Sequence, residues 1–291
     1  MTLSSTGSDE SCYSSLRRVG RDGFLLLRFA RRGPGTVLAA SRFTLPLQAL
    51  EPVMLKDGTA YLMLLNPSGG LVGGDRLTTR IRLEPATHVC LTTPSATKVY
   101  RTVGDPAVHE TTIELGAGAI LEYIPDHLIP HAGAALRQVL RVEMGAASRA
   151  IVTDGYAAGR VGRGERWEFA QLDSLTTVTS GGRLVFFNRT KLTPASVAPA
   201  GAGKAQRFNY VASFLVVADE WHEWEQLRCA LDERLSAFPQ VSGGASLLAR
   251  GGCFARYLTN TAHELSQTTR ALWVTTRRLL LGLDGFDLRK A

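Results

Sequence analysis

The chain has 291 residues, of which 45% are hydrophobic and 20% charged, a balance typical of a soluble globular protein with a large core. Its 33 basic and 26 acidic residues give a net charge of +7, but the basic residues are scattered rather than clustered, which argues against a nucleic-acid binder. The composition excludes collagen-like, coiled-coil and disordered chains, and the length favours a single domain.

The first residues, 1–19, are polar and predict a flexible tail. The apolar run over 24–27 is too short for an export signal, because Arg28, Arg31 and Arg32 place charges directly after it. No stretch reaches the roughly 18 apolar residues that span a bilayer. We therefore expect a cytoplasmic protein without membrane association. The cysteines form no CxxC pair and agree with a reducing compartment: Cys12, Cys90, Cys229 and Cys253.

From about residue 20 to 218 the hydrophobic period is two, which predicts an extensive system of half-buried strands. Glycine-rich turns at 116–119, 145–147 and 180–182 bound these strands and suggest antiparallel connections, the last of them a hairpin. The alternating apolar residues include Ile81, Leu83, Val89, Leu91, Ile113, Leu115, Leu140 and Val142.

From about 219 to 285 the period changes to that of helices. A stripe that ends before Pro239 predicts the first helix, and its aromatic members either pack the core or anchor a partner: Trp221, Trp224 and Phe238. Glycines at 243–244 and 251–252 predict a break. A capping box, Thr261-x-x-Glu264, then begins a second helix that runs to Gly282. The small residues over 194–203 predict a surface loop.

Standard catalytic motifs are absent from the sequence. The glycine run over 69–75 resembles a dinucleotide fingerprint, but an alternating strand follows it where that fingerprint needs a helix. Asn66 and Pro67 start a turn instead. Asp75 at the end of the run either binds the turn amides or serves as a functional carboxylate.

Two further clusters carry candidate ligands. Glu122, Asp126, His127 and His131 suit a divalent transition metal, although prolines within the segment favour an extended chain that presents surface histidines rather than a tight site. Asp154 precedes the glycine–arginine run over 159–165, which ends at Glu165. That run forms either a phosphate-binding nest or a turn held by arginine–carboxylate pairs.

An all-β carbohydrate-active enzyme is an alternative that the residues leave open. Such an enzyme needs two facing carboxyl groups about 5 to 10 Å apart, one of them with a raised pKa. The candidate acids are Asp75, Glu122 and Asp154.

Successive motifs resemble a known family. LNPSGGLVGGD at 65–75, LTTPSATKVYR at 91–101 and LEYIP at 121–125 are similar, in this order and spacing, to the signatures of UreD, also called UreH, the urease accessory proteins. Gly159-Arg160 with Gly164-Glu165, and Leu272-Trp273 with Arg277 and Arg278, extend the resemblance over about 20–285. Many relatives have Glu and an aromatic residue where this chain has His127 and His131, and Gln where it has Pro94.

The resemblance implies a mostly β fold of β-helix-like stacked sheets with two C-terminal helices, as one domain over 20–291. It implies a non-catalytic scaffold for nickel insertion into apo-urease. Such a scaffold contacts the urease subunits on one side and the accessory protein UreF on the other, with the GTPase UreG docked on UreF. No cofactor is expected to stay bound, and nickel is expected only in transit.

A passage for nickel must avoid strong ligation, because each additional 1.4 kcal/mol of site depth slows escape roughly tenfold. Dispersed cysteines and the lack of a paired histidine motif suit transit better than storage. We expect four carboxylates beside recognised motifs to line the passage: Asp75, Glu122, Asp154 and Glu165. His127 and His131 are weaker candidates.

Overall fold

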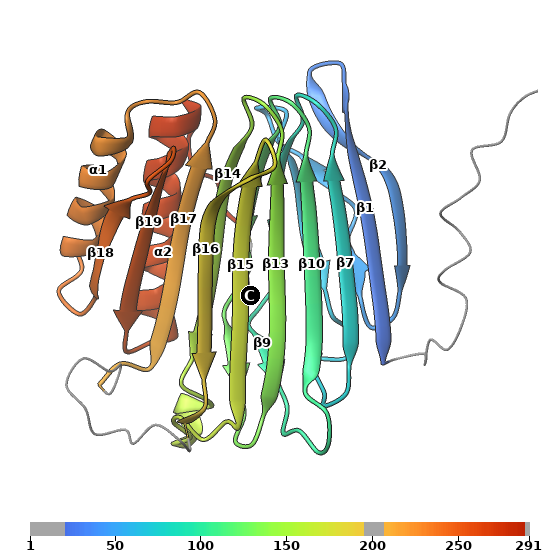
Figure 1. The fold of residues 1–291 in the computed structure, drawn as a ribbon, viewed down its shortest axis with the longest axis vertical. Coiled ribbons are helices and arrows are strands. Elements are labelled where there is room, and N and C mark those ends of the chain that lie inside the picture. Colours follow the sequence, from blue (N-terminus) through green and yellow to red (C-terminus); the bar gives the residue numbers. More distant parts are fainter. Residues whose placement is uncertain (1–20, 195–206, 289–291) are drawn as a thin grey trace, which may run out of the picture.

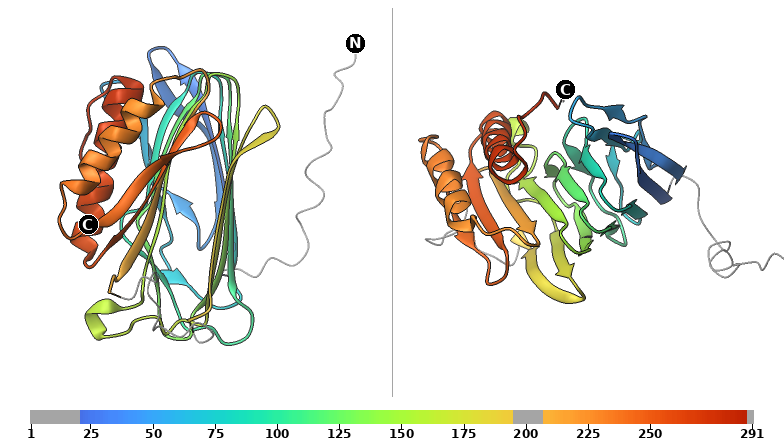
Figure 2. Two further views of the ribbon diagram at one scale, coloured as in Figure 1. Left: turned by 60° about the vertical axis from the view of Figure 1, so that its left-hand side comes forward. Right: turned by 90° about the horizontal axis from the view of Figure 1, so that it is seen from above.

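Two long β-sheets face each other, and two helices cover the outer side of one of them (Figures 1 and 2). The structure, a computed structural model, describes residues 21–194 and 207–288. It confirms the mostly β, stacked-sheet fold with two C-terminal helices. The predicted tail over 1–19 and nearly all of the predicted loop over 194–203 lie outside the described residues. Within the described ranges, no helix has both the length and the apolar character needed to cross a bilayer.

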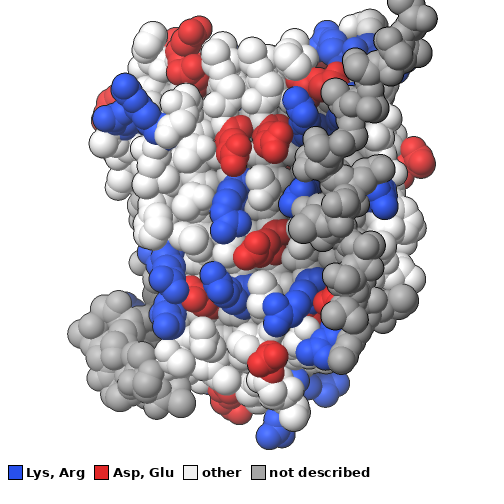
Figure 3. Space-filling view, turned by 45° about the vertical axis from the view of Figure 1, so that its right-hand side comes forward, with Lys and Arg blue, Asp and Glu red and all other residues white. Residues whose placement is uncertain are grey.

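The first sheet has seven strands, and its outer face carries basic and acidic side chains side by side (Figure 3). From one margin to the other the strands are β16 (Arg183–Leu192), β15 (Gln171–Ser180), β13 (Ala135–Met144), β10 (Ala107–Leu115), β7 (Arg76–Leu83), β1 (Asp22–Arg32) and β2 (Gly35–Thr44).

The second sheet is continued by antiparallel strands towards the C-terminus. Its main path is β18 (Ser242–Leu247), β19 (Gly252–Thr259), β17 (Tyr210–Ala218), β14 (Arg149–Ala157), β11 (Ile120–Ile124), β8 (His88–Thr92), β5 (Ala60–Leu65) and β3 (Gln48–Ala49). Short strands pair beside this path: β4 (Val53–Met54), β6 (Gly70–Leu71), β9 (Thr97–Val99) and β12 (Leu128–Pro130).

The chain coils between the sheets, from β7 to β8, β10 to β11 and β13 to β14, and successive coils pair in parallel. The turns over 116–119 and 145–147 therefore join strands of different sheets, and the prediction that they make antiparallel connections is wrong. Glycine indicates a tight turn but does not specify which sheet the next strand enters. The hairpin predicted at 180–182 is confirmed, since it joins β15 to β16.

The core between the sheets consists of side chains stacked at matching levels of successive strands. Ile81, Ile113 and Val142 occupy one level, and all three are at least 98% buried. Because parallel pairing keeps equivalent positions in register, the period-two pattern of each strand builds one continuous apolar layer. A second core lies between the second sheet and the helices.

The helices are α1 (Trp224–Ser236) and α2 (Ala262–Thr276), which continues as a π-helical turn over Arg277–Leu281 and ends at Gly282. The predicted capping box is confirmed, because the Thr261 hydroxyl accepts from the Glu264 amide and the Glu264 carboxylate accepts from the Thr261 amide. Trp221 packs edge-on against Trp224, and both contact the helix-side core.

The predicted interruption between the two helices is confirmed, since α1 ends at Ser236 and α2 begins at Ala262. The glycines at 243–244, however, lie in a strand, β18, and the chain turns at Gly251 and returns as β19. These glycines allow close approach of neighbouring strands. A Cβ at Gly243 would lie 2.6 Å from the carbonyl oxygen of Arg256, and one at Gly252 would lie 2.8 Å from that of Val216. The residue type that indicates a loop therefore serves here to pack backbone against backbone.

The stacked turns leave no room for a side chain at Gly145, and this is testable. A Cβ there would lie 2.7 Å from the carbonyl oxygen of Leu115 in the coil below. We expect Gly145→Ala to lower the free energy of unfolding by about 1–3 kcal/mol, measured by urea denaturation. Gly162→Ala is the control, since no atom lies within 4 Å of its Cβ, and should change stability by less than about 0.5 kcal/mol. Equal stability of both variants would contradict the close stacking.

Candidate functional site

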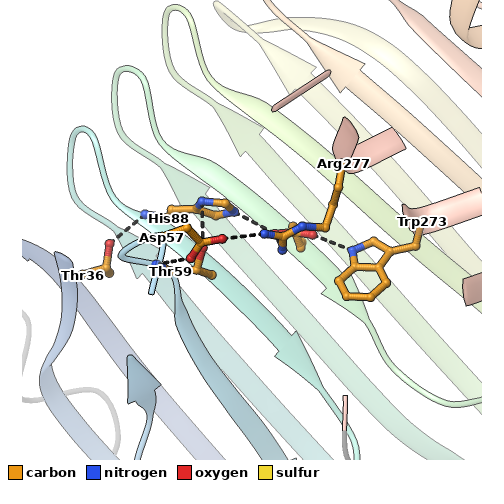
Figure 4. Close-up of polar contacts among 7 residues, drawn as sticks. Thr36, Asp57, Thr59, His88, Trp273 and Arg277 are labelled. Atoms are coloured by element: carbon orange, nitrogen blue, oxygen red, sulfur yellow. Dashed lines mark hydrogen bonds and ion pairs between the residues drawn. The ribbon is translucent and has the colours of Figure 1, made fainter. Parts of the chain in front are cut away.

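A fully buried carboxylate lies beneath the helices. Glu122 on β11 faces α2 and contacts three donors: His88 Nε2 at 2.7 Å, Trp273 Nε1 at 2.5 Å and the Arg277 guanidinium at 2.6 Å. Figure 4 labels the side chains of these three donors. Arg277 is itself fully buried. Because Trp273 belongs to α2 and Arg277 to the turn that follows it, Glu122 links the helix layer to the second sheet through charge-assisted hydrogen bonds.

Asp57 extends this network on the other side of Arg277. The guanidinium donates to Asp57 at 2.7 Å, and the amide of Thr59 donates to the same carboxylate at 3.0 Å. The Thr59 hydroxyl lies 3.0 Å from His88 Nδ1. Burial acts to raise the pKa of Asp57, but the hydrogen bonds from Thr59 and the charge of Arg277 outweigh it and hold that pKa below its ordinary value.

A second polar group lies between the two sheets. Close to the amino ends of the strands, one level of inward positions in the first sheet is polar, whereas the inward residues at the ends themselves are apolar. His109, Gln138 and Ser174 occupy the same level of β10, β13 and β15. His109 Nε2 lies 3.2 Å from the hydroxyl of Thr79. Burial lowers the pKa of His109 to about 4, so its imidazole is neutral at neutral pH and keeps a lone pair.

Asp154 on β14 faces this polar row from the second sheet. It accepts hydrogen bonds from Gln138 Nε2 at 3.2 Å and from the Ser174 hydroxyl at 3.1 Å. Burial raises the pKa of Asp154, although these two hydrogen bonds and Arg256 oppose the shift. Burial, together with the charge of Asp154, also raises the pKa of Tyr123 to about 12. The neutral donors around Asp154 therefore offset only part of the free-energy cost of burying its charged form.

Two cavities adjoin Asp154. The first, of about 340 Å³, is lined by α2 and the second sheet, and the other, of about 180 Å³, is lined by strands of both sheets. Four residues line both cavities: Pro125, Asp126, Thr153 and Asp154. The smaller cavity is also lined by residues from two of the family motifs, over 66–71 and 93–97. Asp126 and Asp154 are therefore the carboxylates at the boundary between the cavities.

Two buried polar atoms of residues that line the larger cavity have no hydrogen-bond partner among the described residues. They are Nδ1 of His127 and the hydroxyl oxygen of Thr153. His127 Nδ1 lies 3.6 Å from the Asp126 carboxylate, and the ring packs edge-on against Tyr210. Buried polar atoms normally have partners, so these two atoms mark a place for water or for a ligand.

The remaining predicted residues lie apart from this boundary. Asp75 is buried and accepts from the Val72 amide at 2.8 Å, as expected of a turn residue, and burial raises its pKa. Glu165 forms a two-point ion pair with Arg160, and the hydrogen bond from Arg160 lowers the pKa of Glu165. These contacts match a turn held by an arginine–carboxylate pair.

His131 packs edge-on against Tyr100, and burial with the nearby positive charges of Arg160 and Lys98 lowers its pKa. His127 and His131 flank β12, an extended segment, as the prolines predicted. The prediction that both are surface histidines is wrong for His127, which is buried. The two histidines therefore do not share a helical face, and only His127 lines a cavity.

The three candidate acids of a carbohydrate-active enzyme differ in their surroundings. Asp75, Glu122 and Asp154 each accept hydrogen bonds from their own donors. Of the three, only Asp154 lines either of the two cavities. Within the described part of the chain, no group of three or more His, Cys, Asp and Glu side chains gathers as a metal site.

Sequence reasoning missed the polar neighbours of Asp154 and Glu122. His109 and Gln138 occupy the same strand parity as the buried Ile113 and Leu140, a local signal that a polar group faces inward. His88 and Arg277 had no such signal, since Arg277 lies 155 residues from Glu122 along the chain.

Comparison of the chain with known proteins finds a family that matches almost its whole length. Residues 21–290 match the family described as UreD urease accessory protein. The chain is 32% identical to the urease accessory protein UreD of Delftia acidovorans over 273 residues, which cover 90% of each chain. It is also 32% identical to that of Deinococcus radiodurans over 281 residues, 95% of this chain and 97% of the relative. The relative from Haloarcula marismortui is 30% identical over 276 residues, 93% of this chain and 91% of the relative.

The buried network predicts a large stability effect at Glu122. We expect Glu122→Gln to lower the free energy of unfolding by about 3 kcal/mol, because the buried Arg277 keeps only the partly exposed Asp57 as a carboxylate partner. Tryptophan fluorescence during urea denaturation reports this loss. Glu84→Gln is the control. It breaks the exposed pair with Arg28 and should cost less than about 1 kcal/mol. Similar effects of the two substitutions would show that the buried pair adds nothing beyond a surface pair.

Proposed function

The chain belongs to the UreD family of urease accessory proteins, and we propose that within urease maturation it acts as a scaffold for nickel insertion into apo-urease. In this proposal it bridges the urease subunits and UreF, and the GTPase UreG docks through UreF. Nickel is the cargo of the assembly and passes through the protein without becoming a resident cofactor. The protein then works by contact and by shape, and its carboxylates guide an ion.

One observation carries the proposal of a passage: Asp154 lines both cavities. An ion that moves from one cavity to the other passes this carboxylate. Asp126 lies at the same boundary, and two polar atoms of residues that line the larger cavity, Nδ1 of His127 and the hydroxyl oxygen of Thr153, have no hydrogen-bond partner among the described residues. On the other side the neutral imidazole of His109 lines the smaller cavity. Carboxylate, imidazole and hydroxyl are all ligands that a divalent nickel ion accepts.

The ligand set suits transit because it is sparse. The described residues hold no group of three or more strong metal ligands, so no preformed cage would trap the ion. Of the four carboxylates expected from the sequence, Asp154 is supported by position, whereas Asp75, Glu122 and Glu165 line neither cavity.

The test combines nickel delivery with stability at Asp154. We expect Asp154→Asn to reduce the nickel content of co-expressed urease, measured by elemental analysis, while leaving assembly of the complex intact. The pKa of Asp154 is higher in the folded than in the unfolded protein, so the free energy of unfolding falls as the pH rises through the window between these two pKa values. The asparagine of the variant does not ionise, so the free energy of unfolding of the variant does not fall for this reason. Above that window the variant should be at least as stable as the parent, and the difference should disappear below about pH 3.8, the ordinary value.

A matched control comes from Asp173, whose pKa the hydrogen bond from Arg189 lowers. Asp173→Asn removes a favourable charge on the outer face of the sheet, so it should lose stability at neutral pH and leave nickel loading unchanged. Normal nickel content with Asp154→Asn would refute the passage. A loss of stability at neutral pH would show that Asp154 serves the fold instead.

A further inference from the structure

The margins of the two sheets differ in how their backbone edges are covered. At β18, the amide of Ala245 donates to the Asp232 carboxylate of α1 at 2.7 Å. At β2, the amide of Thr36 donates to the carbonyl of Gly58 at 3.0 Å. The outer edge of β16 has no such contact, because no hydrogen bond from the described residues reaches its free backbone groups. A ten-residue strand edge is therefore open to pairing.

Side chains on β16 divide cleanly between the two faces. Phe186 points inward, where it is buried and packs against Phe254, and Asn188 accepts a hydrogen bond from Arg256. The outward side chains are all exposed: Leu184, Phe187, Arg189 and Lys191. Leu184 is 55% exposed and Phe187 is 60% exposed, which is unusual for large apolar residues on a strand. The outward stripe thus has its two apolar side chains near the hairpin, where the exposed Arg183 begins the strand, and its two basic side chains towards the other end.

The charge of this edge selects its partner. Basic and acidic side chains alternate over the face of the sheet (Figure 3), but β16 itself carries Arg183, Arg189 and Lys191 and no acidic residue. Arg189 is held in place by two hydrogen bonds to Asp173, at 2.9 and 2.8 Å. A strand that pairs here gains most when it sets acidic side chains against the basic end and apolar ones against Leu184 and Phe187.

A second copy of this chain does not meet that requirement. Two identical edges related by a twofold axis pair antiparallel, so the basic end of each would face the apolar end of the other. Lys191 would then lose water without gaining an acidic partner, and Arg189 would keep only its pair with Asp173. The pattern disfavours self-association through this edge and favours a different chain.

We propose that β16 is a docking edge for an extended segment of a partner protein. The segment adds a strand to the seven-stranded sheet through main-chain hydrogen bonds. Two of its acidic side chains lie opposite the basic residues of the stripe, and two apolar side chains lie opposite Leu184 and Phe187. This surface is separate from the cavities around Asp154. The inference depends on the proposed function only in that a scaffold needs partners.

The test uses the full-length protein and a synthetic peptide, Thr-Glu-Thr-Glu-Thr-Leu-Thr-Leu-Thr, which matches the stripe in the antiparallel direction. Hydrogen–deuterium exchange should show protection of β16 amides by this peptide. The same peptide with Lys in place of Glu should bind at least fivefold more weakly, because it sets like charges opposite each other.

Variants locate the effect on the protein. Lys191→Glu should weaken binding of the acidic peptide about fivefold or more, and Phe187→Ser should weaken binding of both peptides. Arg82→Glu, on the same outer face but on β7, and Val103→Ser, which removes a side chain that is 88% exposed, are the matched controls and should bind normally. Circular dichroism checks that each variant folds.

Three results would overturn the proposal: no protection of β16 at peptide concentrations up to about 1 mM, protection elsewhere, or equal binding of the acidic and basic peptides. Concentration-dependent dimerisation that Lys191→Glu strengthens would also overturn it, in favour of a second copy. The assay involves neither nickel nor urease. Its failure therefore leaves the proposed passage intact, and failure of the Asp154 test leaves this edge intact.

Discussion

The contact between Arg277 and the buried carboxylate of Glu122 determines how the layers of this protein fit together. Both side chains are fully buried, and neither charge is tolerable alone in an interior of low dielectric constant. The pair therefore requires that the end of α2 lie directly over β11. Trp273 donates to the same carboxylate and also lines the larger cavity. The interaction that docks the helix thus also sets one wall of the cavity.

Two buried carboxylates of this protein, Glu122 and Asp154, differ in how fully their neighbours stabilise the charged form. Glu122 has a guanidinium, an indole and an imidazole around it, and nothing of it lines a cavity. Asp154 has two neutral donors and lines two cavities. A fully paired carboxylate holds structure and has no capacity left for a passing cation. A carboxylate that its neighbours stabilise only in part costs folding free energy but retains that capacity.

Local patterns in the sequence predicted the elements better than their arrangement. Alternation located the strands, and the capping box at Thr261 located the start of α2 to the residue. Parallel pairing was not predicted, because a glycine turn looks alike whether the next strand returns beside the last or enters the opposite sheet. The strands β18 and β19 were missed because glycine serves there for close approach rather than for a turn.

The candidate site was predictable only in part, for a related reason. Asp154 was predicted as a site residue because it lies beside a family motif. The alternation of the strand Ala107–Leu115 also places His109 on the inward face. That these two residues approach the same space depends on how two sheets face each other, which no local period encodes. Asp57 and Arg277 meet across 220 positions of the chain. That two residues so far apart in the sequence form a partly buried ion pair can be known only from the tertiary structure.

The open margin of β16 follows from the same construction. A stack of parallel coils does not close on itself, so its terminal strands leave backbone donors and acceptors without partners. At β18 a helix carboxylate occupies one of these donors, whereas at β16 the side chains alone control what pairs. Basic residues on an edge strand suppress indiscriminate association, since they repel one another and retain water. The same basic residues pair favourably with an acidic strand. They therefore both protect the edge from non-specific association and favour an acidic partner.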